Sequence, residues 1–471
     1  MKSLRSFVSH IKILVLFAVV VIAVTEVMNY LYVDDTTEFA RCMMHEFYED
    51  DTNIDRLYLG SSHVFCDIDP TVLDNINGEY NFNLASHMQQ MITSYYLLRE
   101  ADKKHHISRV YLDLFYPCTN AGKGNFREYD SLSPSWAVIN QLRPSANKLS
   151  YMLDLSDPEY YYLTFLPFMR YREKLFSSDY IAEIVKGKQT TEWKNYAYSY
   201  IAPDGSEIIK SGGKGFRIYY GELEYGDFCM KYEESSIAEN PMTKESIEYL
   251  VKIIEYCESH DIELTWIVCP VPDLQLTCVG GYDNYVRQVT ELAEQYHIPY
   301  YDFNLCRREY LDVSDGKYWF DTGHLNSYGA EVYSKFLGDF LLAQEQGKDT
   351  YQDCFYGSYE EKIHDLASEI FGLQIVQSRD YKRYLPDVAE EDREEYAIYR
   401  LRVVTSASVN NDNIRISVKK DLGTGEAEEV PVVQEGSEAY VILSSHEHGE
   451  LYIEAELKGE AESVRWNGIQ Y

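Results

Sequence analysis

Hydrophobic positions in residues 56–115 and 243–342 follow two alternating patterns, one typical of short buried strands and the other of amphipathic helices. Short apolar runs bounded by turn residues predict strands at residues 57–59, 80–84, 110–115, 262–268 and 299–303. Apolar residues spaced three and four apart predict helices at residues 88–104, 243–259, 283–295 and 326–342. This order favours an α/β fold with one parallel sheet between two layers of helices.

The N-terminal segment is basic at its start and then apolar. Lys2, Arg5 and Lys12 precede an apolar run over residues 13–24 that continues weakly beyond it. This pattern predicts a transmembrane helix, and the lack of a small-x-small cleavage site favours a retained signal anchor over a removed signal peptide. Positive charges before the span place the rest of the chain outside the membrane. The alternative is a buried core helix.

Two regions depart from the strand–helix alternation. Residues 119–241 contain many tyrosines and several prolines, and we interpret them as an insertion or cap with short helices. A helix is predicted at residues 359–371, and short alternating runs such as 399–404 and 429–433 are typical of a β-sandwich. The predicted domains are 1–34 (anchor), 35–118 (first part of the α/β domain), 119–241 (insertion), 242–345 (second part), 346–375 (linker helix) and 376–471 (β-sandwich).

Composition excludes some classes of function. The formal net charge of −34 would repel nucleic acids and other polyanions unless a local basic patch intervened. The nine cysteines are scattered without Cys-x-x-Cys or Cys/His zinc spacing, so no metal site and no cofactor are indicated. Their odd number favours buried free thiols, although an exported protein could pair some of them.

Two short motifs carry the candidate chemistry. Ser61 and Ser62 follow the first predicted strand, while Asp321 and His324 precede the last predicted helix. Loops after parallel strands meet at one edge of a sheet, so these residues are expected to converge. A serine hydroxyl needs a base to take its proton, and an aspartate three residues before the histidine could orient that base. Each motif alone is more typical of a turn or a helix cap, and their joint placement favours a serine acyl-transfer site.

On these motifs the chain resembles the SGNH/GDSL hydrolase superfamily, particularly its membrane-anchored cell-envelope branch of DltD-like and polysaccharide O-acyltransferase-like proteins. The resemblance covers residues 56–342 apart from the insertion. It implies a flavodoxin-like three-layer α/β/α sheet, with Ser62 as the nucleophile and Ser61 where the family has an aspartate. It also implies that Asp321 and His324 are the remaining catalytic residues.

The same resemblance implies an oxyanion hole. The backbone N–H groups of Ser62 and Ala85 are its expected donors, with Ala85 in place of a family glycine. The family's asparagine-containing third block is missing, so Asn83 or Asn120 is left as a tentative further donor. Four other histidines near these loops are interpreted as bystanders: His63, His87, His105 and His106.

We therefore expect a single-pass protein of the cell membrane with an extracytoplasmic serine esterase or O-acyltransferase domain. The expected substrate is an acyl ester, and the family branch implies an acylated glycan of the cell envelope. A membrane-embedded acyltransferase is a further expected partner, and nucleic acid is not. The alternative is a non-catalytic cell-envelope scaffold or glycan-binding protein with a degenerate SGNH domain.

Overall fold

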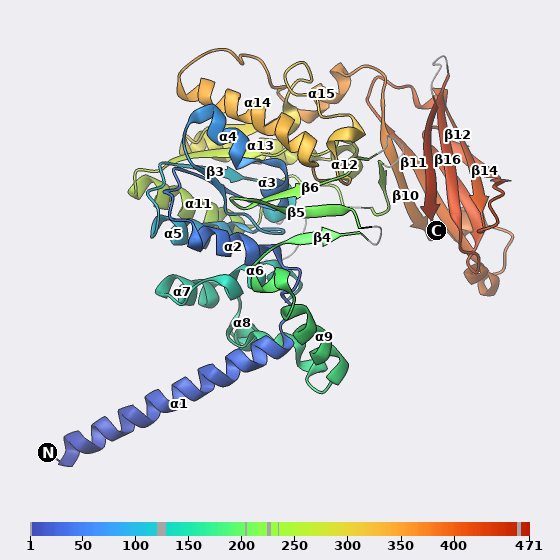
Figure 1. Ribbon diagram of the computed structural model, residues 1–471. Coiled ribbons are helices and arrows are strands. Elements are labelled where there is room, and N and C mark those ends of the chain that lie inside the picture. The colour runs from blue at the N-terminus through green and yellow to red at the C-terminus, as the bar shows by residue number, and fades with distance from the viewer. Residues whose placement is uncertain (1, 120–128, 203–204, 224–227, 234, 459–462) are drawn as a thin grey trace.

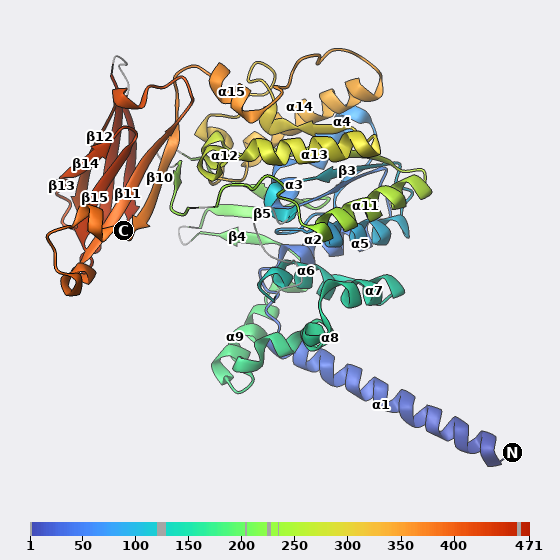
Figure 2. The same cartoon turned by 180° about the vertical axis from the view of Figure 1, so that it is seen from behind.

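The computed structural model describes residues 2–119, 129–202, 205–223, 228–233, 235–458 and 463–471 (Figure 1). The described chain is a mixed α/β structure. It contains one parallel sheet, three further sheets built mainly from antiparallel pairs, and one long apolar helix at the N-terminus. The parallel sheet and its helices form the centre of the molecule, and the C-terminal sheets lie to one side of it (Figures 1 and 2).

The central sheet has the strand order β2-β1-β3-β8-β9, and all its pairs are parallel. Its strands are β1 (Arg56–Leu59), β2 (Asn81–Asn83), β3 (Arg109–Asp113), β8 (Glu263–Val268) and β9 (Tyr300–Asp302). The five strands expected from the sequence are thus confirmed, each to within a few residues. Parallel pairing brings the carboxyl ends of β1, β2 and β3 to the same edge, where the loops after them meet.

Helices cover both faces of this sheet (Figures 1 and 2). Helix α4 (Pro70–Asn77) packs against the closing helix α14 (Ser327–Glu345) on one face, and α5 (Met91–Asp102) packs against α11 (Lys244–Ser259) on the other. The expected cap of α11 is present, because the Thr243 side chain accepts a hydrogen bond from the Ser246 N–H. The remaining helices of this region are α2 (Phe39–Glu49), α3 (Ser62–Asp67), α12 (Asp273–Val279) and α13 (Tyr282–Tyr296).

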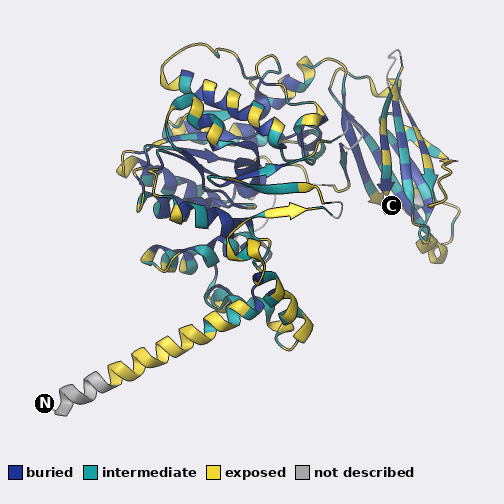
Figure 3. Ribbon diagram, in the orientation of Figure 1, coloured by how far each residue is buried: buried dark blue, intermediate teal, exposed yellow. Residues whose placement is uncertain are grey.

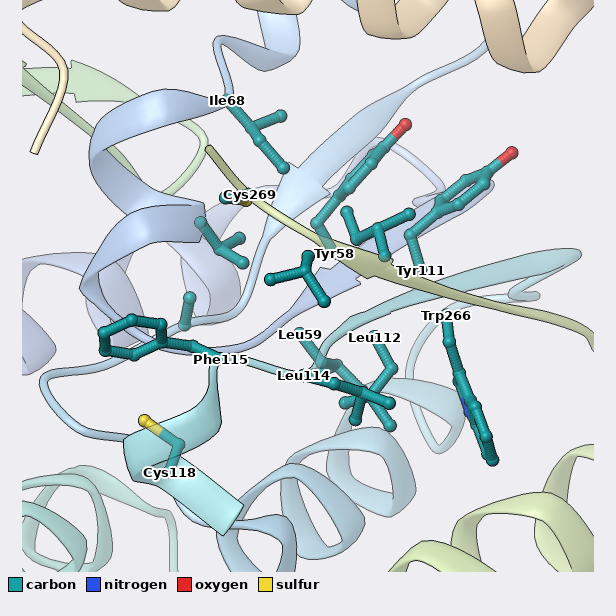
Figure 4. Packing of buried hydrophobic residues seen from close by; sticks show 14 of the residues in the cluster. Tyr58, Leu59, Ile68, Tyr111, Leu112, Leu114, Phe115, Cys118, Trp266 and Cys269 are labelled. Carbon is teal, nitrogen blue, oxygen red and sulfur yellow. The ribbon is translucent and has the colours of Figure 1, made fainter. Parts of the chain in front are cut away.

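The core beneath the carboxyl edge of the central sheet is continuous and mostly apolar. Figure 4 shows Leu59 and Leu112 side by side on adjacent strands, and Tyr58 and Tyr111 stacked on each other on the opposite face of the sheet. The two tyrosine rings are 4.7 Å apart and nearly parallel. The Tyr111 hydroxyl donates to Glu345 at the end of α14, at 2.8 Å, so the last helix is tied to the centre of the sheet.

The insertion is more than a helical cap. Its helices are α6 (Tyr129–Gln141), α7 (Ala146–Leu155), α8 (Tyr161–Phe165), α9 (Ser178–Lys188) and α10 (Thr191–Lys194). It also forms an antiparallel sheet that the sequence did not predict, made of β4 (Ser199–Ile201), β5 (Glu207–Gly213) and β6 (Phe216–Tyr219). The Asn83 N–H donates to the Lys214 carbonyl, so the β5–β6 turn is bonded to the end of β2.

The C-terminal region is a pair of sheets with a shared apolar core. Strand order is β14-β15-β11-β10-β7 in one sheet and β13-β12-β16-β17 in the other. The strands are β7 (Cys229–Met230), β10 (Ile370–Ser378), β11 (Tyr396–Thr405), β12 (Ile414–Asp421), β13 (Glu428–Val430), β14 (Val432–Glu435), β15 (Glu438–Ser444), β16 (Glu450–Leu457) and β17 (Ser463–Gln470).

Two local predictions for this region are wrong. The helix expected through residue 371 ends earlier, as α15 (Tyr359–Asp365), and β10 begins at Ile370 because Leu373 and Ile375 alternate into the sandwich core. The strand expected at residues 429–433 is divided into β13 and β14 at Pro431, which has no N–H to donate to a ladder.

Helix α1 (Lys2–Tyr32) extends away from the rest of the chain, and its described side chains are largely exposed (Figure 3). Within it, His10–Tyr32 is long and apolar enough to cross a membrane, with a mean hydropathy of 2.6 over its most apolar window. None of that window is buried against the protein. A core helix would be covered by other parts of the protein, so the exposure of this apolar window argues against the alternative of a buried core helix.

Candidate active site

Ser62 begins helix α3 directly after β1. Ser61 is the N-cap residue, and its hydroxyl accepts the His63 N–H. The tight turn needs Gly60, which has a φ of 159°, and a Cβ atom there would lie 2.6 Å from the Asp113 Cβ. The turn therefore holds the Ser62 side chain, which is 7% exposed, at the carboxyl edge of the sheet.

The structure brings Ser62, His324 and Asp321 into one hydrogen-bonded line. His324 Nε2 lies 2.8 Å from Ser62 Oγ, and His324 Nδ1 lies 3.0 Å from both carboxylate oxygens of Asp321. Because an ionised carboxylate only accepts, Nδ1 carries the imidazole proton and Nε2 is left to accept the serine O–H. This is the arrangement in which a histidine can act as a base toward a serine.

Asp321 is held as an anion. Burial by itself would raise the pKa of its carboxyl, but the hydrogen bond and positive charge of His324 and two backbone N–H donors outweigh it, and the pKa is lowered. Those donors are the N–H groups of Gly323 and His324, each 2.8 Å from Asp321 Oδ1. The carboxylate thus orders its own turn and the imidazole together.

The loop that carries His324 is anchored at its far end as well. Asp67, at the end of the helix that Ser62 begins, accepts the Leu325 N–H at 3.0 Å. Asn326 caps α14, and its side-chain amide donates to the Gly221 carbonyl in the insertion at 2.7 Å. Short links from both sides therefore fix the spacing between Ser62 and His324.

The expected oxyanion donors differ in whether their N–H groups already have acceptors. The N–H groups of Ser62 and Ala85 lie at the start of α3 and in the loop after β2, and neither has a hydrogen-bond acceptor among the described residues. Asn83 is different: its side-chain amide donates to the carbonyls of Val64 and Ile68, at 3.2 and 2.7 Å. Its proposed role as an oxyanion donor is therefore wrong, because its N–H groups already tie α3 to β2.

Asn120 lies outside the described residues. Two of the histidines interpreted as bystanders, His105 and His106, lie before β3: His105 is buried and its Nδ1 accepts the Ile54 N–H, while His106 is exposed. Within the described part of the chain, neither His105 nor His106 contacts Ser62 or His324.

His63 contacts the candidate catalytic line, although its sequence position suggested a bystander. Its ring lies 5.0 Å from the His324 ring and 4.0 Å from that of Phe115. Burial, followed by the positive charge of His324, lowers the pKa of His63 well below its ordinary value, so the ring stays neutral beside the base. Only its place next to Ser62 could have signalled this contact in the sequence.

A buried carboxyl lies behind these histidines. Asp113, at the end of β3, accepts hydrogen bonds from the Ser61 hydroxyl and the Cys269 N–H, each at 3.2 Å. Burial raises the pKa of Asp113 to about 6, and these hydrogen bonds only partly oppose the shift. No local pattern in the sequence indicated this network, because Asp113 is one of many acidic residues.

Asp113→Asn should make the protein more stable than wild type at neutral pH. In the unfolded chain the Asp113 carboxyl releases its proton at about pH 4, whereas in the folded protein it keeps the proton to about pH 6. The unfolded state is therefore favoured as the pH rises between these values, and wild type loses stability. The difference in unfolding free energy should therefore be near zero at pH 4 and reach at most about 3 kcal/mol above pH 6. Urea unfolding of both proteins at several pH values would measure it, and a pH-independent difference would contradict this account.

The nine cysteines all lie in the described part of the chain, where none forms a disulfide, and seven of them are buried. Among the described residues, no group of three or more His, Cys, Asp or Glu side chains could hold a metal ion.

No family model matches the chain, and no curated protein matches it. The solved structures that share weak similarity with it include the following three. A protein provisionally described as a platelet activating factor from Streptococcus pneumonia is 13% identical, with a TM-score of 0.30, over 68% of this chain and 99% of that one. An engineered protein is 10% identical (TM-score 0.17), and a double mutant of Cellulomonas fimi endo-beta-1,4-mannanase is 9% identical (TM-score 0.16), each over 93% of this chain and 99% of that one. Likenesses this weak identify neither a family nor a function.

Proposed function

We propose that the chain is an SGNH-type serine esterase or O-acyltransferase that acts on acyl esters. The observation that carries this proposal is the continuous hydrogen-bonded line from Asp321 through His324 to Ser62. The strand order of the central sheet, with the first strand between the second and third, matches the flavodoxin-like arrangement and supports the family resemblance.

The proposed reaction begins when Ser62 Oγ attacks the ester carbonyl. His324 Nε2 takes the serine proton, and Asp321 stabilises the imidazolium that forms. The carbonyl oxygen becomes an oxyanion, which the N–H groups of Ser62 and Ala85 would bind. The C–O bond to the leaving alcohol then breaks, His324 returns the proton to that alcohol, and the acyl group stays on Ser62.

The acceptor in the second half-reaction decides whether the enzyme is an esterase or an acyltransferase. An acceptor hydroxyl attacks the acyl-enzyme while His324 takes its proton, and collapse of the intermediate returns that proton to Ser62. Water as the acceptor gives an acid and makes the protein an esterase. A sugar hydroxyl gives a new ester and makes it an O-acyltransferase.

We further propose an extracytoplasmic location and a cell-envelope polysaccharide as the substrate. Helix α1 supports an anchored protein, because its apolar length suits a bilayer and none of its most apolar window is buried against the protein. The positive charges before the span favour export of the domain. The polysaccharide rests on the family resemblance, as does a membrane-embedded acyltransferase partner.

Covalent labelling tests the nucleophile directly. A fluorophosphonate probe should modify wild-type protein at Ser62, found by mass spectrometry, and the same protein should hydrolyse para-nitrophenyl acetate. Addition of a glycan acceptor should divert acyl groups from water if transfer is the native reaction. If folded wild-type protein is neither labelled nor able to hydrolyse the ester, the alternative of a non-catalytic scaffold is favoured.

Removal of residues 1–34 should release the protein from membranes. The full chain is expected in the membrane fraction even after a high-salt wash, since an apolar helix of this length is held by lipid and not by charge. The shortened chain should be soluble and keep esterase activity. External protease added to intact cells should digest the full-length domain, and protection of the domain would contradict the proposed orientation.

A further inference from the structure

Arg217 is a buried cation without a contacting counterion. It lies on β6 of the insertion and is 7% exposed, and among the described residues no carboxylate lies within ion-pair distance of it. Its Nε is buried without an acceptor. Arg217 and Glu38 interact through their charges, but the two side chains form no ion pair, and burial raises the pKa of the Glu38 carboxyl. Buried charges are usually paired, so this guanidinium calls for an explanation.

Four aromatic rings surround the guanidinium. The Tyr219, Tyr198, Phe65 and Phe39 ring centres lie 4.7, 4.8, 5.6 and 5.9 Å from its central carbon. Such contacts stabilise a cation through the negative faces of the rings. They leave the net positive charge in place, in a chain whose overall charge is −34.

Among the described residues, the side chain of Arg217 has a hydrogen bond to His87, which was interpreted from the sequence as a bystander. Arg217 Nη1 lies 3.1 Å from His87 Nε2. Because a guanidinium can only donate, Nε2 must accept, and the proton of the neutral ring is therefore on Nδ1. His87 thus keeps a neutral ring with an N–H donor.

This pair borders the candidate active site. His87 is an exposed residue two positions after Ala85, and its ring lies 4.9 Å from that of Phe65 and nearly perpendicular to it, in the helix that Ser62 begins. Tyr219, two positions after Arg217, packs against Phe320 with the two rings tilted and 4.1 Å apart, and its ring lies 6.3 Å from the His324 ring. The insertion therefore brings a positive charge to the Ser62–His324 edge from the side of β2.

We propose that Arg217 and His87 bind a fixed negative charge on the substrate, a carboxylate or similar anionic oxygen close to the ester. His87 Nδ1–H would donate to that oxygen, and Arg217 would supply the positive charge behind it. Elsewhere the acidic chain repels anions, so a local cation is needed to admit such a substrate. This inference rests on the proposed function, and it specifies the substrate as an anionic ester.

Matched esters test the preference. One pair is para-acetoxybenzoate and its methyl ester, which differ by a charge on the alcohol side. The other is mono-para-nitrophenyl succinate and its methyl ester, which differ on the acyl side. For at least one pair, wild type should favour the anionic member in kcat/KM, and Arg217→Met or His87→Ala should lower the ratio about tenfold or more, the usual effect of losing a charge-assisted hydrogen bond. Equal ratios in all proteins for both pairs would overturn the proposal.

A binding measurement separates this idea from the proposed reaction. Titration calorimetry of para-acetoxybenzoate and mono-para-nitrophenyl succinate into the Ser62→Ala protein needs no turnover. Arg217→Met or His87→Ala in that background should weaken the binding of one of these anions, while His106→Ala, at another exposed histidine, should not. Arg217→Lys, which retains the charge, should keep part of the affinity. Unchanged binding in His87→Ala, where little folding risk arises at an exposed residue, would refute the anion site even if the esterase reaction is confirmed.

Discussion

Ser62→Ala is expected to lower kcat for ester hydrolysis by about 10⁴- to 10⁶-fold, and His324→Ala should do the same. The reason is the shared proton: Ser62 Oγ and His324 Nε2 are 2.8 Å apart, and neither group activates the carbonyl attack without the other. Steady-state hydrolysis of para-nitrophenyl acetate by the domain without α1 would measure both effects. The double variant should be no slower than either single variant, because the two residues act as one unit.

Ser178→Ala provides the matched control for this measurement. Ser178 is an exposed serine at the start of α9 in the insertion, far along the chain from both motifs. Its kcat and KM should equal those of wild type. A Ser62→Ala protein that is folded and retains wild-type kcat would place the nucleophile elsewhere.

Asp321→Asn should lower kcat by about 10³- to 10⁴-fold and leave the protein folded. The amide nitrogen of asparagine can donate to His324 Nδ1, which would move the imidazole proton to Nε2 and remove the acceptor that Ser62 needs. The amide oxygen can still accept from the backbone N–H groups of Gly323 and His324, so the turn should persist. The loss should therefore appear in kcat and not in thermal stability.

Asp312→Asn is a suitable comparison. Asp312 is an exposed aspartate that accepts hydrogen bonds from Ser314 in a nearby turn, so it shares the local chemistry of Asp321 without a histidine partner. Its variant should hydrolyse esters at the wild-type rate. Equal losses in both variants would show that the turn, and not the orientation of His324, is what matters.

The tertiary structure corrected several readings that looked reasonable along the chain. Asn83 had the right residue type and the right strand for an oxyanion donor, yet its amide is used by the carbonyls of Val64 and Ile68. His63 and His87 were set aside, and one stacks beside His324 while the other is bonded to Arg217. Hydrogen-bond partners such as these are separated by up to 130 positions, and no local pattern records them.

The sequence by itself determined the five parallel strands, the apolar N-terminal helix and the positions of Ser62, Asp321 and His324 at loop and helix boundaries. These follow from local physics: side-chain periodicity, caps, and a short Asp-x-x-His turn whose partners are neighbours in the chain. Only the tertiary structure decided that Ser62 meets His324, that Asp113 is buried behind them and that the insertion brings Arg217 to the site. Such pairings depend on how separate crossover connections and the insertion pack on the sheet, because burial and charge are properties of the assembled core and not of any one segment.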